Sequence, residues 1–337
     1  MVIAIQNRRV FIKQRPKGMP VIDDVGVEDE AIEDIPPGHV VAKVDTLSMD
    51  AWIRTTLNEE GMHRTGDIGS TIRALGVGQI IESNSDKLAV GDWVYGPMAA
   101  QTHALLADSA ATRIMPEDGI PPGAFAGPLG ITTGLTAWVG LVSIGEVQKD
   151  DVVVVSGAAG AVGSVVVQLA KQRGAFVIGI AGGPDKCTYL TDTLGADIAI
   201  DYKNSDVGEA LAKAAPDGLD IFFDNVGGEI LDHALGNLAQ SGARVVICGA
   251  ISQYQNLGDV RGPKLYLRLA ERNASMRGFV VSHYAAHYPQ AIAEISNLLR
   301  SGKLVLPEHV VEGIDQFPEA LFMLFNGKHL GNLVVRL

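Results

Sequence analysis

The most regular pattern of apolar and polar positions lies between residues 151 and 183. Residues 152–155 are a run of valines, which is typical of a strand buried on both faces of a parallel sheet. After a glycine-containing turn, residues 165–170 are apolar at helical spacing, and Gly174 follows where such a helix would end. Residues 176–180 form a second apolar run. This order of strand, turn, helix and strand predicts a βαβ unit.

The turn of this unit reads Ala158-Ala-Gly160-Ala-Val-Gly163. A dinucleotide-binding turn usually has three glycines, and Ala158 stands where the first of them would be. The turn nevertheless lies between a strand and a helix, where free N–H groups at the helix N-terminus can bind a pyrophosphate. Gly160 would let the backbone approach the phosphates, and Gly163 would let helix and strand pack closely. We expect a dinucleotide site here; the alternative is a glycine turn without a ligand.

The end of the second strand indicates which dinucleotide is bound. NAD sites usually place Asp or Glu there, to accept hydrogen bonds from the adenosine ribose. This chain has Ala181-Gly182-Gly183 instead, and Lys186 follows at the start of the next predicted helix. Without a carboxylate to repel a 2′-phosphate, and with a lysine nearby, the site favours NADPH. The alternative is that Lys186 is solvated and that the site accepts either cofactor.

The alternation of strands and helices continues after this unit and predicts an α/β fold with a doubly wound parallel sheet. The expected elements are helices at 185–194, 206–214 and 230–238, strands at 198–201, 221–224 and 243–248, and a loop at 249–262.

The first 125 residues have a different character, with short alternating strands separated by proline and glycine. They predict a β-rich domain, followed by a helical stretch at residues 121–149. The tail is expected to return to the β-rich domain. The predicted strands are 10–12, 39–45, 75–82, 93–96, 303–311 and 333–336, with a short helical or irregular loop at 48–64 and a helix at 318–325.

Composition limits the possible partners. The 337-residue chain has a formal net charge of −12, which argues against nucleic acid or an anionic membrane as a partner. The N-terminus lacks the apolar core of a signal peptide, and the longest apolar stretch is interrupted by polar residues. Only Cys187 and Cys248 occur, so no disulfide framework is expected and a cytoplasmic location is predicted.

A zinc site is not expected. The β-rich part contains no cysteine, and its histidines, His39, His63 and His103, are not spaced as a ligand cluster. Without a Lewis acid, oxidation of an alcohol becomes less attractive than reduction of a carbon–carbon double bond that a carbonyl polarises.

Three strings carry a resemblance to a known family: residues 156–164, SGAAGAVGS; residues 224–228, DNVGG; and residues 248–254, CGAISQY. Together with the order of the domains, they resemble the zinc-independent branch of the medium-chain dehydrogenase/reductase superfamily. That branch holds leukotriene and prostaglandin reductases, plant double-bond reductases and bacterial curcumin reductases. The resemblance covers the whole chain.

The resemblance implies a Rossmann dinucleotide-binding domain at residues 126–302 and a GroES-like substrate domain at 1–125 and 303–337. It implies a homodimer that reduces the double bond of α,β-unsaturated ketones and aldehydes with NADPH. Lys186 and Tyr202 would contact the 2′-phosphate. The other implied cofactor-binding residues are Gly160, Ala161, Val162 and Gly163 at the pyrophosphate, Asn225 along the cofactor, and Cys248, Gly249, Ala250, Ile251, Ser252, Tyr254, Phe279, Val280 and Val281 around the nicotinamide.

Tyr254 is the candidate catalytic residue. Hydride delivery to the β-carbon produces an enolate, so a donor at the substrate oxygen stabilises charge that is absent from the ground state. Tyr254 lies on the loop after a predicted central strand, and ligands of open α/β sheets bind at the carboxyl ends of strands. The alternative is an aromatic side chain that only packs the pocket.

Two positions depart from the branch. Its usual Asp-Pro-Tyr-Met-Arg is here Asp50-Ala-Trp52-Ile-Arg54, so the substrate range is open. Asp50 and Arg54 would orient a substrate, or form a surface ion pair worth about 0.3–0.5 kcal/mol. His329 stands where the branch usually has asparagine, either as a nicotinamide-side donor or at the domain cleft.

Two other functions remain open from the sequence. One is an NADPH quinone reductase on the same scaffold. The other is a non-catalytic NADPH-binding protein.

Overall fold

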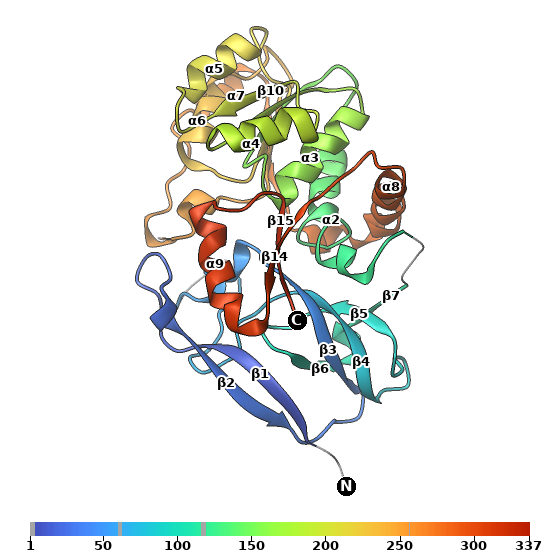
Figure 1. Cartoon of the computed structure of the whole chain (residues 1–337). Coiled ribbons are helices and arrows are strands. Elements are labelled where there is room, and N and C mark those ends of the chain that lie inside the picture. Colours follow the sequence, from blue (N-terminus) through green and yellow to red (C-terminus); the bar gives the residue numbers. More distant parts are fainter. Residues whose placement is uncertain (1–3, 60–62, 116–118, 256) are drawn as a thin grey trace. The chain divides into compact units, whose positions relative to one another are not determined.

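The computed structural model describes residues 4–59, 63–115, 119–255 and 257–337. Contacts divide the chain into two units, Met1–Gly127 with Glu308–Leu337, and Pro128–Pro307 (Figure 1). The domain boundaries that we expected from the sequence lay at 125/126 and 302/303. The structure thus has one unit built from both ends of the chain and a second unit built from its middle.

The first unit is built mainly from antiparallel strands. Its larger sheet has the order β14-β15-β3-β4-β5-β7, β6 pairs with β3, and β1 pairs with β2 in a separate hairpin. The strands are β1 Ile5–Ile12, β2 Val25–Ile32, β3 His39–Ser48, β4 Gly76–Asn84, β5 Trp93–Gly96, β6 His103–Ala107, β7 Thr112–Ile114, β14 Glu308–Glu312 and β15 Asn332–Arg336. The helical segments are η1 Ile22–Asp24, α1 Trp52–Thr56, η2 Asp108–Ala110, η3 Pro122–Ala126, η9 Ile314–Gln316 and α9 Phe317–Asn326.

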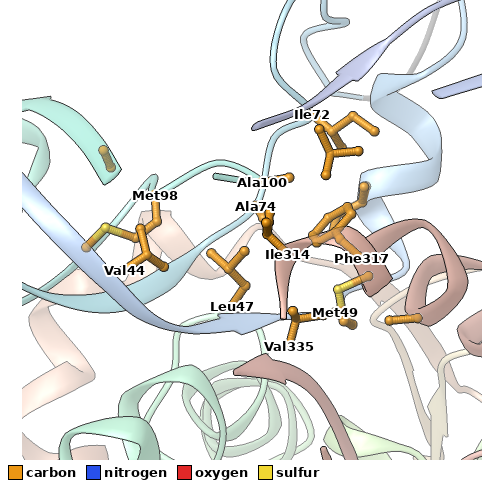
Figure 2. Packing of buried hydrophobic residues seen from close by; sticks show 14 of the residues in the cluster. Val44, Leu47, Met49, Ile72, Ala74, Met98, Ala100, Ile314, Phe317 and Val335 are labelled. Carbon is orange, nitrogen blue, oxygen red and sulfur yellow. The ribbon is translucent and has the colours of Figure 1, made fainter. Parts of the chain in front are cut away.

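The core of this unit lies between the sheet and α9. Figure 2 shows Leu47 and Met49 near Phe317 and Val335, which belong to one cluster of buried side chains. Phe317 comes from α9 and Val335 from β15, so residues more than 250 positions after β3 complete its core. The tail is therefore part of this unit, as the sequence predicted. The strand expected to begin at residue 303, however, begins only at Glu308.

The hairpin strand β2 was not predicted from the sequence. Three acidic residues, Glu28, Asp29 and Glu30, interrupt its apolar alternation and are exposed. In the hairpin, all three of these carboxylates form ion pairs with Arg8 or Arg9 of β1. Pairing of charges across the strands thus replaces the apolar pattern from which a strand is usually recognised.

The second unit is a three-layer α/β fold, as predicted. Its six-stranded sheet is parallel throughout, in the order β10-β9-β8-β11-β12-β13. The strands are β8 Val152–Ser156, β9 Phe176–Ala181, β10 Ile198–Asp201, β11 Ile221–Asp224, β12 Arg244–Ile247 and β13 Ser275–Gly278. The helical segments are α2 Gly134–Trp138, η4 Val139–Ile144, α3 Ala161–Gln172, α4 Pro184–Thr188, η5 Tyr189–Thr193, α5 Val207–Ala214, α6 Gly228–Gly236, η6 Ile251–Gln253, η7 Leu257–Asp259, α7 Leu267–Glu271, η8 Val281–His287 and α8 Tyr288–Arg300.

Several segments of this unit differ from the sequence-based expectation. The helix expected at 185–194 begins one residue earlier and changes to a π-helical turn at Tyr189. The loop expected at 249–262 contains two short 3-10 turns, and α8 and β13 were not predicted. The four residues of β13 are all exposed and read Ser-Met-Arg-Gly, so they carry no apolar signal.

No helix in the described ranges is long and apolar enough to cross a membrane.

The core of the second unit provides a stability test with a matched control. Phe222, in the middle of β11, is fully buried, whereas Phe176, at the start of β9, is 38% exposed. We expect Phe222→Ala to lower the free energy of unfolding by about 3–5 kcal/mol, because it leaves a cavity in a close-packed layer. Phe176→Ala should cost much less. Thermal denaturation followed by circular dichroism measures both, and equal losses would contradict this description of the core.

Candidate active site

The candidate site of the second unit lies where the parallel strands end. The turns that follow β8, β11 and β12 leave the sheet at the same edge, since all strands run in one direction. Open α/β sheets bind ligands at this edge. The glycine turn, Asn225 and the loop from Cys248 to Tyr254 all begin there.

The glycine turn has the backbone geometry that a phosphate cradle needs. A Cβ atom at Gly163 would lie 2.4 Å from the Gly157 carbonyl oxygen, so no larger residue fits between helix and turn without a shift. At Gly160, a Cβ would meet only that same oxygen, at 3.3 Å, which leaves the approach to the turn open. The close contact at Gly163 agrees with the packing role suggested from the sequence, and the role of Gly160 at the phosphates stays a prediction.

Helix α3 begins directly after this turn with an uncapped N-terminus. Its N-cap residue is Gly160, which makes no side-chain capping hydrogen bond. The N–H groups of Ala161, Val162 and Gly163 belong to the first turn, where no carbonyl lies four residues back within the helix. Together with the positive end of the helix dipole, they can hold a pyrophosphate. The residues present therefore fit a dinucleotide.

A pair of lysines lies beyond the end of β9. Burial, and then the nearby charge of Lys203, lower the pKa of Lys186. A Cβ at Gly182 would lie 2.8 Å from the Tyr202 ring and 2.9 Å from Lys203 Cε, so both side chains pack against this glycine. Within the described ranges, neither lysine forms an ion pair with a carboxylate. Two close cations make this place a candidate anion site, although the Asp201 carboxylate also lies close enough to Lys203 for the lysine charge to affect its pKa.

Lys203 was not singled out from the sequence. Its position directly after Tyr202 could have pointed to it. The backbone of this loop is held by Asp201. The Asp201 carboxylate accepts hydrogen bonds from the backbone N–H groups of Gly183, at 2.8 Å, and Lys203, at 3.0 Å. The same contacts, with one from Asn204, lower the pKa of Asp201. This carboxylate thus joins the two loops that carry the anion site.

Asn225 is oriented by the last residue of β8. Its side-chain amide donates to the Ser156 carbonyl at 2.7 Å, and its backbone N–H donates to Ser156 Oγ at 2.8 Å. Ser156, fully buried, was quoted in the sequence only as part of a string and was not assigned a role. Asn225 is therefore held in place by bonds to a neighbouring strand.

The loop from Cys248 to Tyr254 is held on the turn that follows β11. Backbone N–H groups of Ile251 and Ser252 donate to the carbonyls of Asn225 and Val226, both at 3.2 Å. Ser252 Oγ donates to the Val226 carbonyl at 2.6 Å. The loop that carries Tyr254 and the turn that carries Asn225 therefore form one hydrogen-bonded assembly.

The Tyr254 hydroxyl is buried within this assembly. Its oxygen accepts a hydrogen bond from the Ala250 N–H at 3.1 Å, so the hydroxyl proton is not used in that contact. Only 7% of the residue is exposed, and burial raises the pKa of the hydroxyl. A Cβ at Gly249 would lie 3.0 Å from the same oxygen. The geometry suits a neutral hydrogen-bond donor.

The environment of Cys248 disfavours ionisation of its thiol. Burial and the charge of Asp224 raise the pKa of its thiol to about 12, so the reactive thiolate is scarce.

Residues at the end of β13 and directly after it line an open hollow on the second unit. Arg277, Phe279, Val280, His283 and Tyr284 surround it, and Arg277 donates to the Tyr284 hydroxyl at 3.0 Å. Phe279 packs edge-to-face on Tyr284, with ring centroids 6.4 Å apart. Phe279 and Val280 thus lie at a surface that a ligand can reach, while Val281 begins the next helical turn.

The remaining candidates belong to the first unit. Asp50 accepts from Ser48 Oγ at 3.0 Å and from Trp52 Nε1 at 3.2 Å. Arg54 is 1% exposed, and it donates to the Gly18 carbonyl at 2.6 Å. Because Asp50 is also buried, the alternative of a surface ion pair between Asp50 and Arg54 is wrong.

Trp52 is only partly buried, and its ring lies 5.7 Å from that of His63. Burial lowers the pKa of His63. The other candidate histidine of this unit, His329, is buried, with 9% of its surface exposed. Among the described residues, no group of three or more His, Cys, Asp or Glu side chains is placed to hold a metal ion.

Comparison with known proteins agrees with this geometry. A family model described as N-terminal domain of oxidoreductase matches residues 8–114, and one described as zinc-binding dehydrogenase matches residues 161–297. A putative NADP-dependent oxidoreductase of Bacillus subtilis is 37% identical over 98% of this chain and 97% of its own length. A 2-alkenal reductase (NADP(+)-dependent) of Nicotiana tabacum is 34% identical over 99% and 98%, respectively.

A solved structure extends the likeness to three dimensions. The crystal structure of CurA from Vibrio vulnificus in complex with NADPH superimposes with a TM-score of 0.89, at 34% identity, and 98% of each chain is covered. The fold, the order of the domains and these relatives together show that the chain belongs to the medium-chain dehydrogenase/reductase superfamily, in the branch that includes the curcumin, 2-alkenal and prostaglandin reductases.

Proposed function

We propose that the protein is an NADPH-dependent reductase of the carbon–carbon double bond of α,β-unsaturated ketones and aldehydes. The observation that carries the proposal is the buried Tyr254 hydroxyl, which accepts from the Ala250 N–H on a loop at the same edge of the parallel sheet as the glycine turn. The printed activities of the relatives, 2-alkenal reductase and curcumin reductase, support the same class of reaction. When bound, NADPH would supply the hydride.

The residues of the chain divide the binding of NADPH between them. The first-turn N–H groups of α3 hold the pyrophosphate, and Lys186, Tyr202 and Lys203 hold the 2′-phosphate. Two cations near one phosphate suit its double charge, which a chain with a net charge of −12 must meet locally. The nicotinamide half is bound by Asn225, the loop from Cys248 to Tyr254 and the segment Phe279-Val280-Val281.

Tyr254 supplies the hydrogen bond that the reaction needs. Negative charge develops on the substrate oxygen as the β-carbon is reduced, and a donor placed there binds the transition state more tightly than the substrate. Burial raises the pKa of Tyr254, so the proton stays on the hydroxyl at neutral pH. In this proposal no metal ion takes part.

We propose a substrate contact for Trp52, whose side chain is partly exposed. Asp50 and Arg54 are buried and hydrogen-bonded within their own unit, which favours a role in holding the Trp52 loop. His329 stays a candidate donor on the nicotinamide side. The cytoplasmic location expected from the cysteines also stays a prediction.

An activity screen tests the proposed reaction and cofactor. We expect oxidation of NADPH with small enals, cyclic enones and aryl enones, and at least tenfold lower kcat/KM with NADH. Lys186→Ala should reduce kcat/KM for NADPH about tenfold and leave NADH nearly unchanged, because it removes a charge-assisted contact to the 2′-phosphate. Lys213→Ala, on the exposed face of α5, is the matched control.

The outcomes separate the alternatives. A preference for NADH would contradict the lysine assignment. Turnover with quinones alone would indicate a quinone reductase. Thermal stabilisation by NADPH, without its oxidation by any substrate, would indicate a binding protein.

Tyr254→Phe tests the proposed hydrogen-bond donor. We expect kcat to fall about 100-fold at saturating NADPH, as for the loss of one donor to an oxyanion, with little change in NADPH affinity. Tyr266→Phe, at a side chain that is 58% exposed, should change neither. Stopped-flow oxidation of NADPH, normalised to bound cofactor, gives the comparison. Unchanged turnover per bound NADPH would show that Tyr254 only packs the pocket.

We further propose that the protein is a homodimer that pairs through β13. This strand is at the edge of the parallel sheet, and all of its residues are exposed. Ser275 donates its N–H to Ala243 of the segment before β12, so the Met276 N–H points to the open side. Met276 and Val280 are 38% and 57% exposed. An edge with free donors and apolar side chains favours pairing with a second chain.

Light scattering during gel filtration tests the dimer. At micromolar concentration we expect twice the mass of the 35.6-kDa chain. Met276→Pro removes a donor on the open side and should yield monomers, whereas Met276→Val keeps that donor and should remain dimeric. A monomeric wild-type protein would contradict the proposal.

A further inference from the structure

Asp224 is an ionisable residue that the proposed function has not yet used. It is the last residue of β11 and it is completely buried. Carboxylates are rarely buried to this degree without a partner, because removing a charge from water is costly. Burial indeed raises the pKa of Asp224. Within the described part of the chain, its hydrogen-bond donors are a hydroxyl and backbone N–H groups, not a cationic side chain.

These donors join the ends of two strands. The Asp224 Oδ1 atom accepts from Ser156 Oγ of β8 at 2.7 Å and from the N–H groups of Val226 and Gly227 at 2.9 and 3.0 Å. Oδ2 accepts from the Gly227 N–H at 3.1 Å. The carboxylate thus fixes the turn after β11 and ties that turn to β8.

The backbone of the same residue reaches the third strand. The Asp224 carbonyl accepts from the N–H groups of Cys248 and Gly249, at 2.9 and 3.1 Å, just after β12. Ser156, the partner of the carboxylate, also accepts from the Asn225 N–H through its Oγ, at 2.8 Å. One buried residue therefore links Asn225 to the start of the loop that carries Tyr254.

We propose that Asp224 is a positioning residue. It holds Asn225 and the loop from Cys248 to Tyr254 in the arrangement that binds the nicotinamide half of the dinucleotide. The inference rests on the proposed function, since it concerns NADPH. The printed hydrogen bonds of Asp224 do not reach Lys186, Tyr202 or Lys203. The two halves of the cofactor should therefore respond differently to a change at Asp224.

The electrostatics of the loop agree with this role. Burial is the main cause that raises the pKa of Tyr254, and the charge of Asp224 adds to it. The same carboxylate therefore helps to keep the Tyr254 hydroxyl protonated.

The chain offers a matched control for this carboxylate. Asp220 lies four residues earlier, just before β11, and its Oδ2 accepts from the Val152 N–H at 2.8 Å. It thus joins the same two strands, β8 and β11, at their opposite ends. An effect that comes only from weaker strand pairing should appear in both Asp220→Asn and Asp224→Asn.

Calorimetric binding of two ligands tests the inference without turnover. NADPH occupies the whole site, whereas adenosine 2′,5′-bisphosphate lacks the nicotinamide half. An Asn side chain keeps one acceptor oxygen but replaces the other with an NH₂ group, which repels the Gly227 N–H. We expect Asp224→Asn to weaken NADPH binding about tenfold and to leave binding of adenosine 2′,5′-bisphosphate within twofold. Asp220→Asn should leave both affinities unchanged.

Ser156→Ala provides a second variant if Asp224→Asn does not fold. It removes the hydroxyl that joins Asp224 to Asn225, and it should also weaken NADPH binding selectively. Equal weakening of both ligands, an unchanged ratio of the two affinities, or the same change in Asp220→Asn would overturn the inference. The wild-type protein separates this result from the proposed function. If it fails to bind NADPH at all, the proposed function is wrong before any variant is compared.

Discussion

The parallel pairing of β8 with both β9 and β11 is the constraint on which the site depends. Parallel strands end at one edge of the sheet, and each ends with backbone groups that the sheet no longer pairs. At this edge the chain satisfies some of these groups by short contacts between neighbouring turns. It leaves others, at the start of α3, for a ligand. The candidate site is therefore the place where backbone N–H groups at the start of α3 have no partner within the helix.

The contacts that hold the edge together come from small side chains and backbone. Ser156, Asn225 and Asp224 join three strand ends with hydrogen bonds of 2.7–3.1 Å, and the loop from Cys248 to Tyr254 is attached to them. Buried networks of this kind are stable only when every member has its partner. A network with all its partners rigidifies the surrounding backbone, so the reactive loop needs little ordering when a ligand binds.

The sequence predicted those features whose signals are local. The valine run of β8, the glycine turn and the apolar spacing of α3 each lie within a dozen residues, so the βαβ unit and the close packing at Gly163 could be derived. Strand β13 was missed because Ser-Met-Arg-Gly has no apolar pattern. The burial of Arg54, the lysine beside Tyr202 and the hydrogen bonds of Asp224 depend on residues distant in sequence. Their roles become visible only when the strands are placed side by side.

The closeness of Lys186 and Lys203 has an energetic consequence for the empty protein. Burial, and then the nearby charge of Lys203, lower the pKa of Lys186, so the charged form of this lysine is costly; Lys203 itself packs against Gly182. In the proposed binding mode, a doubly charged 2′-phosphate would offset this cost. Ordinary buffer anions would relieve it as well. Phosphate or sulfate in the medium would thus stabilise the fold and, if the proposed assignment holds, compete with the cofactor for the same lysines.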